Sequence, residues 1–520
     1  MRRVQMLAGV LLIAFGSLSV AAAPECVWGQ YGNDPGHSFA QTPECSSITP
    51  VTVNTLVPKW LVRTGSPVTA SPAVADGTVY VGANNGTFYA IDAETGAVNW
   101  TYKVDDRNNI YVGLVSSPAV PKIAGKRVVL FGRGGTLYML DGATGNVLAR
   151  ACVDPRLPTA TRCAGSQSHI QIESSPSFVW VDSQPWVLVG MDVHDDRDVG
   201  RTGIVALRID VPDGTGEWGM TPLWKFDPEN QQTYTGPGLL WANAGTGTGC
   251  GGSWSSPAVD VAGDMVFFGT GSCSIGSLKD GPWSGESLYG IRLRTGAFRW
   301  HYNPRVDRGE STRLDDDFGA STNLLPFGRV GDGSKDGWYY GLKRDRPNVS
   351  AIGPGEWASH AGQAGHAGMD FAIGGMIGSA AVGEARNRPV IFATTAISTP
   401  LNNGSNGLDL TLLEDPGRLF SLHAIDAKNG KILWRSPLSR QSYGAPTYAN
   451  GLVYVPSTVA FSLLIFHADT GALLRIMPLN GAPSSAPAIV GNSVYMGTGT
   501  TQEGIPIEAL SGIWAFRALL

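Results

Sequence analysis

Short apolar runs separated by turn residues recur along the whole chain. The stretch 78–92 is typical: an apolar strand through Val79–Val81, a turn at Asn84–Gly86 and a partner strand through Phe88–Ala90. An Asn-Gly turn between two such runs favours an antiparallel hairpin. The pattern therefore predicts an all-β protein built from hairpins.

A repeated marker follows many of these hairpins. The pattern Ala-x-Asp-x-x-x-Gly-x-x-x-Trp occurs intact at Ala90–Trp100 and at Ala424–Trp434. Asp can bond the turn backbone, Gly can adopt positive φ, and Trp can dock between neighbouring sheets. Altered copies keep the spacing at Asp141 and Gly145, at Gly290, Gly296 and Trp300 with Arg292 in the Asp place, and at His467 and Gly471.

A second marker, a segment of small residues before a β-branched or aromatic strand, occurs eight times. Strands that converge on a crowded axis need such small residues, and the spacing of 41 to 81 residues fits four-stranded sheets with variable loops. The copies begin at Ser71, Ser117, Ser175, Ser256, Ala320, Ser379, Ala445 and Ala486.

These repeats predict one domain over residues 23–520, an eight-bladed β-propeller of four-stranded antiparallel blades. The last predicted strand reaches Trp514–Phe516 with no marker after it. We therefore expect Pro58–Trp60 to supply the missing strand, so that the N-terminal segment 23–60 completes the last blade.

Composition excludes several other classes of protein. Of 520 residues, 43% are hydrophobic and 16% charged, which disfavours a disordered tail. The net charge of −5 disfavours a basic nucleic-acid binder. With 68 glycines, 33 prolines and 15 tryptophans, a helical bundle is excluded as well.

The first residues have the pattern of an export signal. Arg2 and Arg3 precede an apolar run over Met6–Phe15, and small residues follow through Ala23. This pattern predicts a signal peptide over residues 1–22. The alternative, a membrane anchor, is disfavoured because the run is short for a span. We expect a secreted or periplasmic protein with no membrane span in the mature chain.

Six cysteines form three locally spaced pairs. In an exported chain such pairs normally oxidise to disulfides, whereas a thiolate metal site is the weaker alternative. Because the sequence contains no C-x-x-C-H pattern, we expect no covalent haem. The pairs are Cys26 with Cys45, Cys152 with Cys163 and Cys250 with Cys273.

The intact markers resemble the tryptophan-docking motif of quinoprotein alcohol dehydrogenases, propellers that bind pyrroloquinoline quinone (PQQ). Within that resemblance, Gly251–Asp260 followed by Phe268–Gly271 is similar to the segment under the cofactor. Leu314–Ser321 and Lys335–Gly337 are most similar to the polyvinyl-alcohol-dehydrogenase branch, although this chain lacks the haem domain of that branch.

The resemblance implies a set of site residues. PQQ is a planar tricarboxylate quinone, so its pocket needs an aromatic face, cationic partners, a divalent cation and a base. The family pattern implies Trp254 as the stacking residue, Lys335 at the quinone edge, and Glu173 and Ser272 as calcium ligands. The alternatives are packing along the channel for Trp254 and a hairpin lysine for Lys335.

Two positions depart from the family pattern. Arg292 occupies the position that we align with the catalytic aspartate, and a permanent cation cannot accept a proton, although it can bind quinone carboxylates. Ser272 replaces a calcium-binding asparagine. Asp317 or Asp315 could take over as base or as cation ligand, while a solvated turn is the alternative interpretation.

Three further clusters have weaker interpretations. Asp332–Gly337 resembles the start of a calcium loop, but Lys343 stands where an acid is needed, so a hairpin is favoured. His194 among nearby aspartates is interpreted as part of an exposed loop rather than a metal site. His360 and His366 lie in an insertion that is either a flexible loop or a binding lid.

Two functions of different class follow. The first is an exported PQQ-dependent oxidoreductase that acts on an alcohol, a polymeric one included, and passes electrons to a separate acceptor protein. The second is a non-catalytic propeller that binds a macromolecular partner, as the outer-membrane assembly propellers do. The first is favoured because the resemblance to the dehydrogenases extends over the mature chain.

Overall fold

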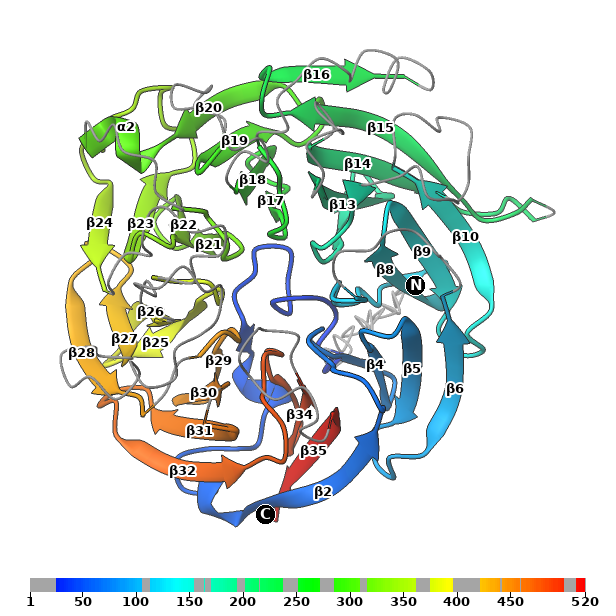
Figure 1. Ribbon diagram of the computed structural model, residues 1–520, viewed down its shortest axis with the longest axis vertical. Helices are drawn as coiled ribbons and strands as arrows, with labels where there is room; N and C mark the ends of the chain where they lie inside the picture. The colour runs from blue at the N-terminus through cyan, green and yellow to red at the C-terminus, as the bar shows by residue number, and fades with distance from the viewer. Residues whose placement is uncertain are drawn as a thin grey trace, which may run out of the picture.

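Eight antiparallel sheets surround a central axis in this computed structural model, which confirms the predicted propeller (Figure 1). Each blade is built on four consecutive strands, except that the last takes one strand from the N-terminal region. The two-residue strand β1 (Ala40–Gln41) adds in parallel to the innermost strand of blade seven. The structure describes residues 25–104, 113–153, 163, 170–193, 202–214, 216–236, 251–271, 285–308, 316–361, 375–395, 421–439, 442–458, 460–499 and 511–519.

In the first four blades the strands follow one another from the innermost position outward. These blades comprise β3 (Ala73–Ala75), β4 (Thr78–Gly82), β5 (Thr87–Asp92) and β6 (Val98–Lys103); β7 (Lys122–Ile123), β8 (Lys126–Arg133), β9 (Thr136–Asp141) and β10 (Val147–Cys152); β12 (Ser177–Val181), β13 (Gln184–Val193), β14 (Gly203–Asp210) and β15 (Gly219–Asp227), extended by β11 (Ile170–Gln171) and β16 (Gln232–Thr235); and β17 (Ala258–Asp260), β18 (Met265–Gly269), β19 (Leu288–Arg292) and β20 (Phe298–Tyr302).

Blades five to eight follow the same order. They comprise β21 (Asn323–Leu325), β22 (Arg329–Gly333), β23 (Trp338–Lys343) and β24 (Trp357–His360); β25 (Ala381–Ala385), β26 (Arg388–Thr394), β27 (Ser421–Asp426) and β28 (Ile432–Pro437); β29 (Thr447–Ala449), β30 (Leu452–Ser457), β31 (Ser462–His467) and β32 (Leu473–Pro478); and β33 (Ala488–Val490), β34 (Ser493–Thr498), β35 (Gly512–Ala518) and β2 (Leu56–Arg63). The short helix α2 (Pro304–Arg308) follows blade four.

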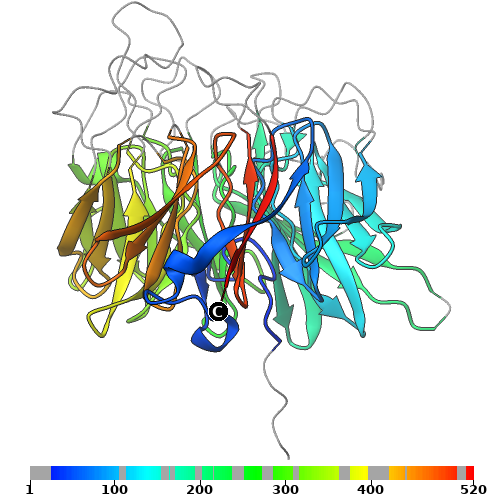
Figure 2. The same ribbon diagram turned by 90° about the horizontal axis from the view of Figure 1, so that it is seen from below.

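Strand β2 closes the ring as predicted. It pairs antiparallel with β35 (Figure 2), and Trp60 lies opposite Ala515 in the register of the two strands. The indole nitrogen of Trp60 donates a hydrogen bond to the Ala93 carbonyl in blade one. Strand β2 therefore completes the last blade and also joins it to the first blade.

The marker tryptophans dock on the next blade, as the repeat predicted. The Trp100 indole donates to the Gly142 carbonyl, and a Cβ on Gly145 would lie 2.6 Å from its ring. Gly145 has φ 73°, a conformation that glycine adopts without strain. The same arrangement repeats with Trp60 on Gly96, Trp224 on Gly296 and Trp434 on Gly471. The interblade contacts are thus repeats of one local structure.

Hydrogen bonds join the small-residue segments of most neighbouring blades around the axis. The backbone N–H of Ser71 donates to the Ser117 hydroxyl in the next blade, and the same bond repeats as far as Ser379 in blade six. Ala445 and Ala486 offer no hydroxyl, but the Ala486 N–H donates to Ser71 and so joins the last blade to the first. The other bonds run from Ser117 to Ser175, Ser175 to Ser256, Ser256 to Ser321 and Ser321 to Ser379.

Residues 27–47, which we call the axial segment, lie at the centre of the ring, a placement that the sequence pattern did not predict (Figure 1). This segment hydrogen-bonds to the innermost part of every blade in turn. Its contacts are Trp28 with Val74, Gly29 with Val120, Gln30 with Phe178, Pro35 with Val259, Gly36 with Leu324, Ser38 with Val382, Phe39 with Tyr448, and Cys45 with Gly491. The inner strand edges, which are otherwise open, are therefore covered by this chain's own backbone.

The Cys26–Cys45 disulfide closes most of the axial segment into a loop. A second disulfide joins Cys152 and Cys163, and both bridges confirm predicted pairs. Cys250 and Cys273 lie outside the described residues, as does the predicted signal peptide. Within the described part of the chain, no helix has the length and apolar character needed to cross a membrane.

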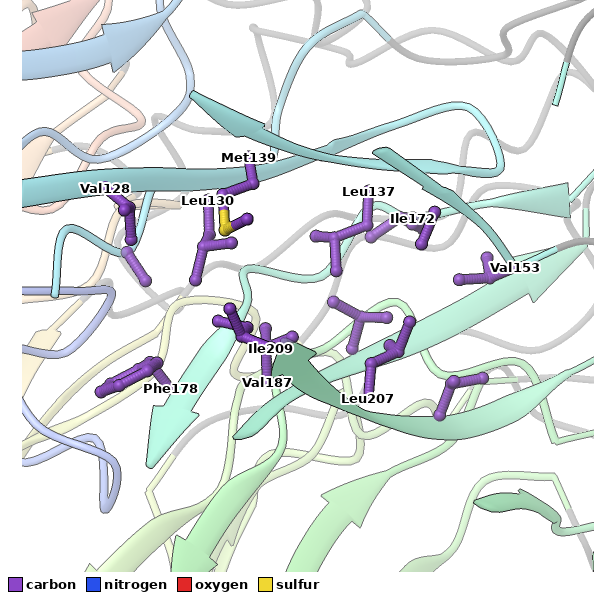
Figure 3. Packing of buried hydrophobic residues seen from close by; sticks show 14 of the residues in the cluster. Val128, Leu130, Leu137, Met139, Val153, Ile172, Phe178, Val187, Leu207 and Ile209 are labelled. Carbon is purple, nitrogen blue, oxygen red and sulfur yellow. The ribbon is translucent and has the colours of Figure 1, made fainter. Parts of the chain in front are cut away.

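The hydrophobic core is distributed between the blades. Figure 3 shows the cluster between blades two and three, where Leu130 and Met139 face Val187 and Leu207. All four side chains are fully buried. Because strands alternate their faces, each blade contributes one set of side chains to each neighbouring layer.

Candidate active site

Trp254 stands at the inner edge of blade four, in the segment that enters β17. Two glycines from other segments approach the edges of its ring. A Cβ on Gly271 would lie 2.8 Å from the indole nitrogen, and a Cβ on Gly319 would lie 2.3 Å from Cη2. Trp254 is half-buried, so part of the ring remains accessible. Only glycine at both positions leaves room for the indole.

Lys335 and Asp317 meet beside this ring. The Lys335 ammonium lies 2.7 Å from Asp317 Oδ2 and 5.7 Å from the centre of the Trp254 ring. Their backbones are joined as well, since the Lys335 N–H donates to the Asp317 carbonyl. Lys335 lies in the turn between β22 and β23, and Asp317 precedes β21. Blade five therefore places a cation and a carboxylate next to the aromatic residue of blade four.

A second buried ion pair lies behind Asp317. Arg305 of α2 contacts the Glu286 carboxylate with a nitrogen–oxygen distance of 2.5 Å. The other Glu286 oxygen lies 3.4 Å from the backbone nitrogen of Asp316, which donates to it. Sequence reasoning missed both residues, because neither belongs to a repeated marker and their pairing joins separate segments.

Burial and charge act together on Glu286. Burial raises its pKa above the ordinary value, and the nearby Asp317 carboxylate raises it further, while Arg305 opposes both effects. Two carboxyl groups thus share one region, each with its own cationic partner. Such an arrangement is typical of sites that move protons, although structural ion-pair networks produce it too.

Comparison with known proteins identifies the family. Residues 28–307 match the family described as glucose/ethanol/alcohol dehydrogenase, β-propeller domain, named for PQQ, and this match covers more than half of the chain. The chain belongs to this PQQ β-propeller family. Residues 414–512 also match the family described as outer membrane protein assembly factor BamB.

Curated relatives of this PQQ-family propeller are quinone-dependent alcohol dehydrogenases. A 255-residue alignment is 27% identical to quinohemoprotein alcohol dehydrogenase from Comamonas testosteroni and covers 45% of this chain and 33% of that protein. The dehydrogenase subunit of alcohol dehydrogenase (quinone) from Gluconacetobacter polyoxogenes is 24% identical over 257 residues, covering 45% and 32%. The matched segment thus spans about a third of these relatives.

Solved structures show the same fold. The crystal structure of the Comamonas testosteroni enzyme aligns with a TM-score of 0.65 at 18% identity, over 95% of this chain and 80% of that one. A europium-containing methanol dehydrogenase aligns with a TM-score of 0.66 at 15% identity, over 95% and 98%. At these identities, the structural likeness supports the architecture alone.

Arg292 does not join the cluster. Arg292 is the last residue of β19 and lies opposite Met265. The end of the sheet near Trp254 is the opposite one, where β18 ends at Gly269. Four residue steps along β18 separate these ends by roughly 13 Å. The Arg292 side chain lies near the Met265 sulfur, and the backbone N–H of Arg292 donates to the Ala297 carbonyl in the hairpin turn. The structure therefore separates Arg292 from Trp254 and Lys335, contrary to our expectation that it would bind the same cofactor.

Of the expected calcium ligands and bases, only some fall within the described residues. Glu173 lies beside Ser174, whose hydroxyl donates to the Gly190 carbonyl in blade three. Gly190 in turn lies against Ser253, next to Trp254 in blade four. Ser272 and Asp315 lie outside the described residues. Where the structure describes the chain, no three His, Cys, Asp or Glu side chains form a group able to hold a metal ion.

The stretch Asp332–Gly337 forms the end of the β22–β23 hairpin, as favoured over a calcium loop. Asp336 accepts hydrogen bonds from the Trp338 N–H and the Tyr340 hydroxyl, and Asp332 is fully buried in β22. Burial raises the pKa of Asp332 well above its usual range. His360 stacks on Trp338, whereas His194 and His366 lie outside the described residues.

Proposed function

We propose that this PQQ-family propeller is an extracytoplasmic PQQ-dependent oxidoreductase that oxidises an alcohol. The observation that supports this most directly is the cluster of Trp254, Lys335 and Asp317 at the inner edge of blades four and five. Family membership and the quinone-dependent relatives support the same activity.

The residues present fit a planar, anionic quinone. Gly271 and Gly319 leave the edges of Trp254 free of side chains, and the half-buried ring offers a stacking surface. Lys335 places positive charge beside that ring, where a quinone oxygen or carboxylate would find a partner. An aromatic surface and a buried cation are two of the features that the cofactor needs.

The carboxylate of the cluster suits the role of base. When bound, PQQ would supply the two-electron acceptor for an alcohol. Asp317 Oδ2 is held by Lys335, while Oδ1 lies on the side of Gly271, 3.5 Å from the position of a Cβ there. We assign Oδ1 as the acceptor of the alcohol proton. Asp317 thus takes the role for which Arg292 is unsuited.

The remaining parts of the proposal concern the cation, the acceptor and the compartment. Glu173 and Ser272 are the proposed calcium ligands, with Asp315 as a further candidate carboxylate. Electrons would pass to a separate acceptor protein. Export is supported by the two disulfides, since such bonds persist in oxidising compartments.

The test is equilibration of the purified protein with PQQ and calcium, removal of free cofactor, and measurement of retained quinone absorbance and dye-linked alcohol oxidation. We expect Trp254→Ala to lose retained quinone. Asp317→Asn should retain quinone and lose turnover. Trp180→Ala, an exposed tryptophan of β12, is the matched control.

If no variant and no wild-type preparation retains quinone, the oxidoreductase proposal is wrong. The match of residues 414–512 to an assembly-factor family would then favour a propeller that binds another macromolecule. Turnover without dependence on Trp254 would place the site elsewhere.

A further inference from the structure

Glu286 occupies an unusual backbone position at the edge of the proposed site. Its φ is 51°, a left-handed conformation that side chains other than glycine rarely adopt. Its N–H donates to the carbonyl of Gly271, the glycine that packs against Trp254 and Asp317. Strained residues persist where the surroundings hold them firmly, often at functional sites.

The helix α2 holds a cation against Glu286. The Asn303 side chain accepts hydrogen bonds from the N–H groups of Arg305 and Val306 and so caps the start of this helix. The amide of the same side chain donates to the Gly285 carbonyl and the Ser287 hydroxyl, on either side of Glu286. Asn303 therefore fixes Arg305 relative to the carboxylate that it contacts.

The segment containing Asp316 and Asp317 is held from two blades. From blade four, the Glu286 carboxylate accepts the Asp316 N–H. From blade five, the Ser334 hydroxyl donates to the Asp316 carbonyl, and the Lys335 N–H donates to the Asp317 carbonyl. Asp316 is fully buried, so water does not readily replace these bonds.

We propose that Glu286, held by Arg305, is a positioning residue that fixes the backbone at Asp316 and so holds the Asp317 carboxylate against Lys335 beside the Trp254 ring. This inference rests on the proposed function for its catalytic consequence. The carboxylate oxygen that bonds Asp316 lies one peptide away from the proposed base, which is why a shift there moves the base itself. Glu286 need not touch substrate or cofactor.

Two substitutions separate the bond from the charge. Glu286→Gln keeps an acceptor oxygen for the Asp316 N–H and loses the negative charge, whereas Glu286→Leu loses both. Arg294→Gln is the matched control, because Arg294 also belongs to blade four but pairs with Asp182 and Asp264 on exposed turns.

Hydrogen exchange of the full chain without cofactor gives the first measurement. For Glu286→Leu we expect exchange at least tenfold faster at residues 316–318 and 334–337. Glu286→Gln should lie close to wild type, and Arg294→Gln should not change these residues. Wild-type exchange there in Glu286→Leu overturns the proposal. If that variant does not fold, Glu286→Asp, which shortens the side chain, replaces it with the same expected and contrary outcomes.

Alcohol oxidation with PQQ and calcium gives the second measurement. Glu286→Leu should lower kcat at least tenfold with KM changed less than threefold, and Glu286→Gln should recover most of the loss. An unchanged kcat in Glu286→Leu would contradict the positioning role. If the wild type retains no quinone, the proposed function fails, and the exchange experiment still decides whether Glu286 holds the Asp316–Asp317 backbone.

Discussion

The Nζ atom of Lys335 lies 2.7 Å from Oδ2 of Asp317, and the two side chains are only 12% and 10% exposed. Removal of one partner from such a pair leaves an uncompensated buried charge. We therefore expect Lys335→Met to lower the free energy of unfolding by about 3 kcal/mol. The double variant Lys335→Met/Asp317→Asn should recover most of that loss in urea titrations. Additive losses would show that the two groups are not coupled.

Gly319 is expected to be essential for the shape of the site. A Cβ there would lie 2.3 Å from Trp254 Cη2, so Gly319→Ala must displace the indole. Retained quinone absorbance should fall at least as much as in Trp254→Ala. Gly219→Ala in β15 is the control, because its nearest atom is the end of the Asp210 side chain. Full retention in Gly319→Ala would exclude stacking on this ring.

Trp60 is expected to carry much of the ring closure. It contacts Gly96 and hydrogen-bonds Ala93 in the first blade. Since the side chain is partly buried, Trp60→Ala should cost about 3 kcal/mol of unfolding free energy, measured by urea denaturation. Trp180→Ala, 47% exposed, should change it by less than about 0.5 kcal/mol. Equal effects would show that blade eight closes without this contact.

The disulfides predict a thiol count. Titration of unfolded, unreduced protein should find almost no free cysteine among six, including the predicted pair of Cys250 and Cys273. Replacement of Cys26 and Cys45 by serine should lower the unfolding free energy by about 3 kcal/mol, because their bridge closes a loop of 19 residues. Two reactive thiols would mean that one pair stays reduced.

His37 predicts a pH dependence of stability. Burial lowers its pKa from 6.5 to about 4, and its Nδ1 lies 3.1 Å from the Thr322 carbonyl, so the neutral ring donates this bond. Between these pH values the unfolded state binds more protons than the folded state. The contribution of His37 therefore falls by about 3 kcal/mol as the pH is lowered from 6.5 to 4.

His37→Asn is the corresponding variant. Asparagine can donate a similar bond and tolerates the left-handed φ of 54° at this position. Its stability curve should be flatter than that of the wild type between pH 6.5 and 4. Parallel curves would assign the acid sensitivity to other groups, among them His423, whose pKa burial lowers to about 3.

The repeat was predictable because each marker residue acts locally. Asp92 accepts the N–H groups of Glu94 and Thr95 in its own turn, and the tryptophans repeat one contact with the next blade. Local chemistry of this kind leaves a spacing in the sequence. The eight blades and their closure by Trp60 follow from it.

The site was predictable only in part. Trp254, Lys335 and Asp317 stood within motifs that resemble a family, and the structure brings them together. Arg292 belongs to the hairpin marker of blade four, and this marker lies at the end of the sheet away from Trp254. Glu286 and Arg305 left no signal, because an ion pair between separate segments has no characteristic spacing.

The axial segment also left no signal, since most of its contacts are made by backbone groups that every residue carries. Apart from the side-chain bonds of Gln30 and Gln41, its hydrogen bonds to the blades depend on the curvature of its path. The positive φ values of Asn33, His37 and Phe39 create that path, and sequence patterns do not reveal them.

Because the axial segment touches every blade, its last partners are synthesised long after the segment itself. The Gln41 side chain donates to the Ile489 carbonyl, a bond between residues 448 positions apart. At typical rates of about 5–20 residues per second, a ribosome needs tens of seconds to synthesise the intervening residues. During that interval the segment has no completed ring to bind, and contacts of such long range form slowly. The native axis can therefore be completed only after synthesis has reached the last blade. Complete docking of the axial segment is thus a late step in the folding of this protein.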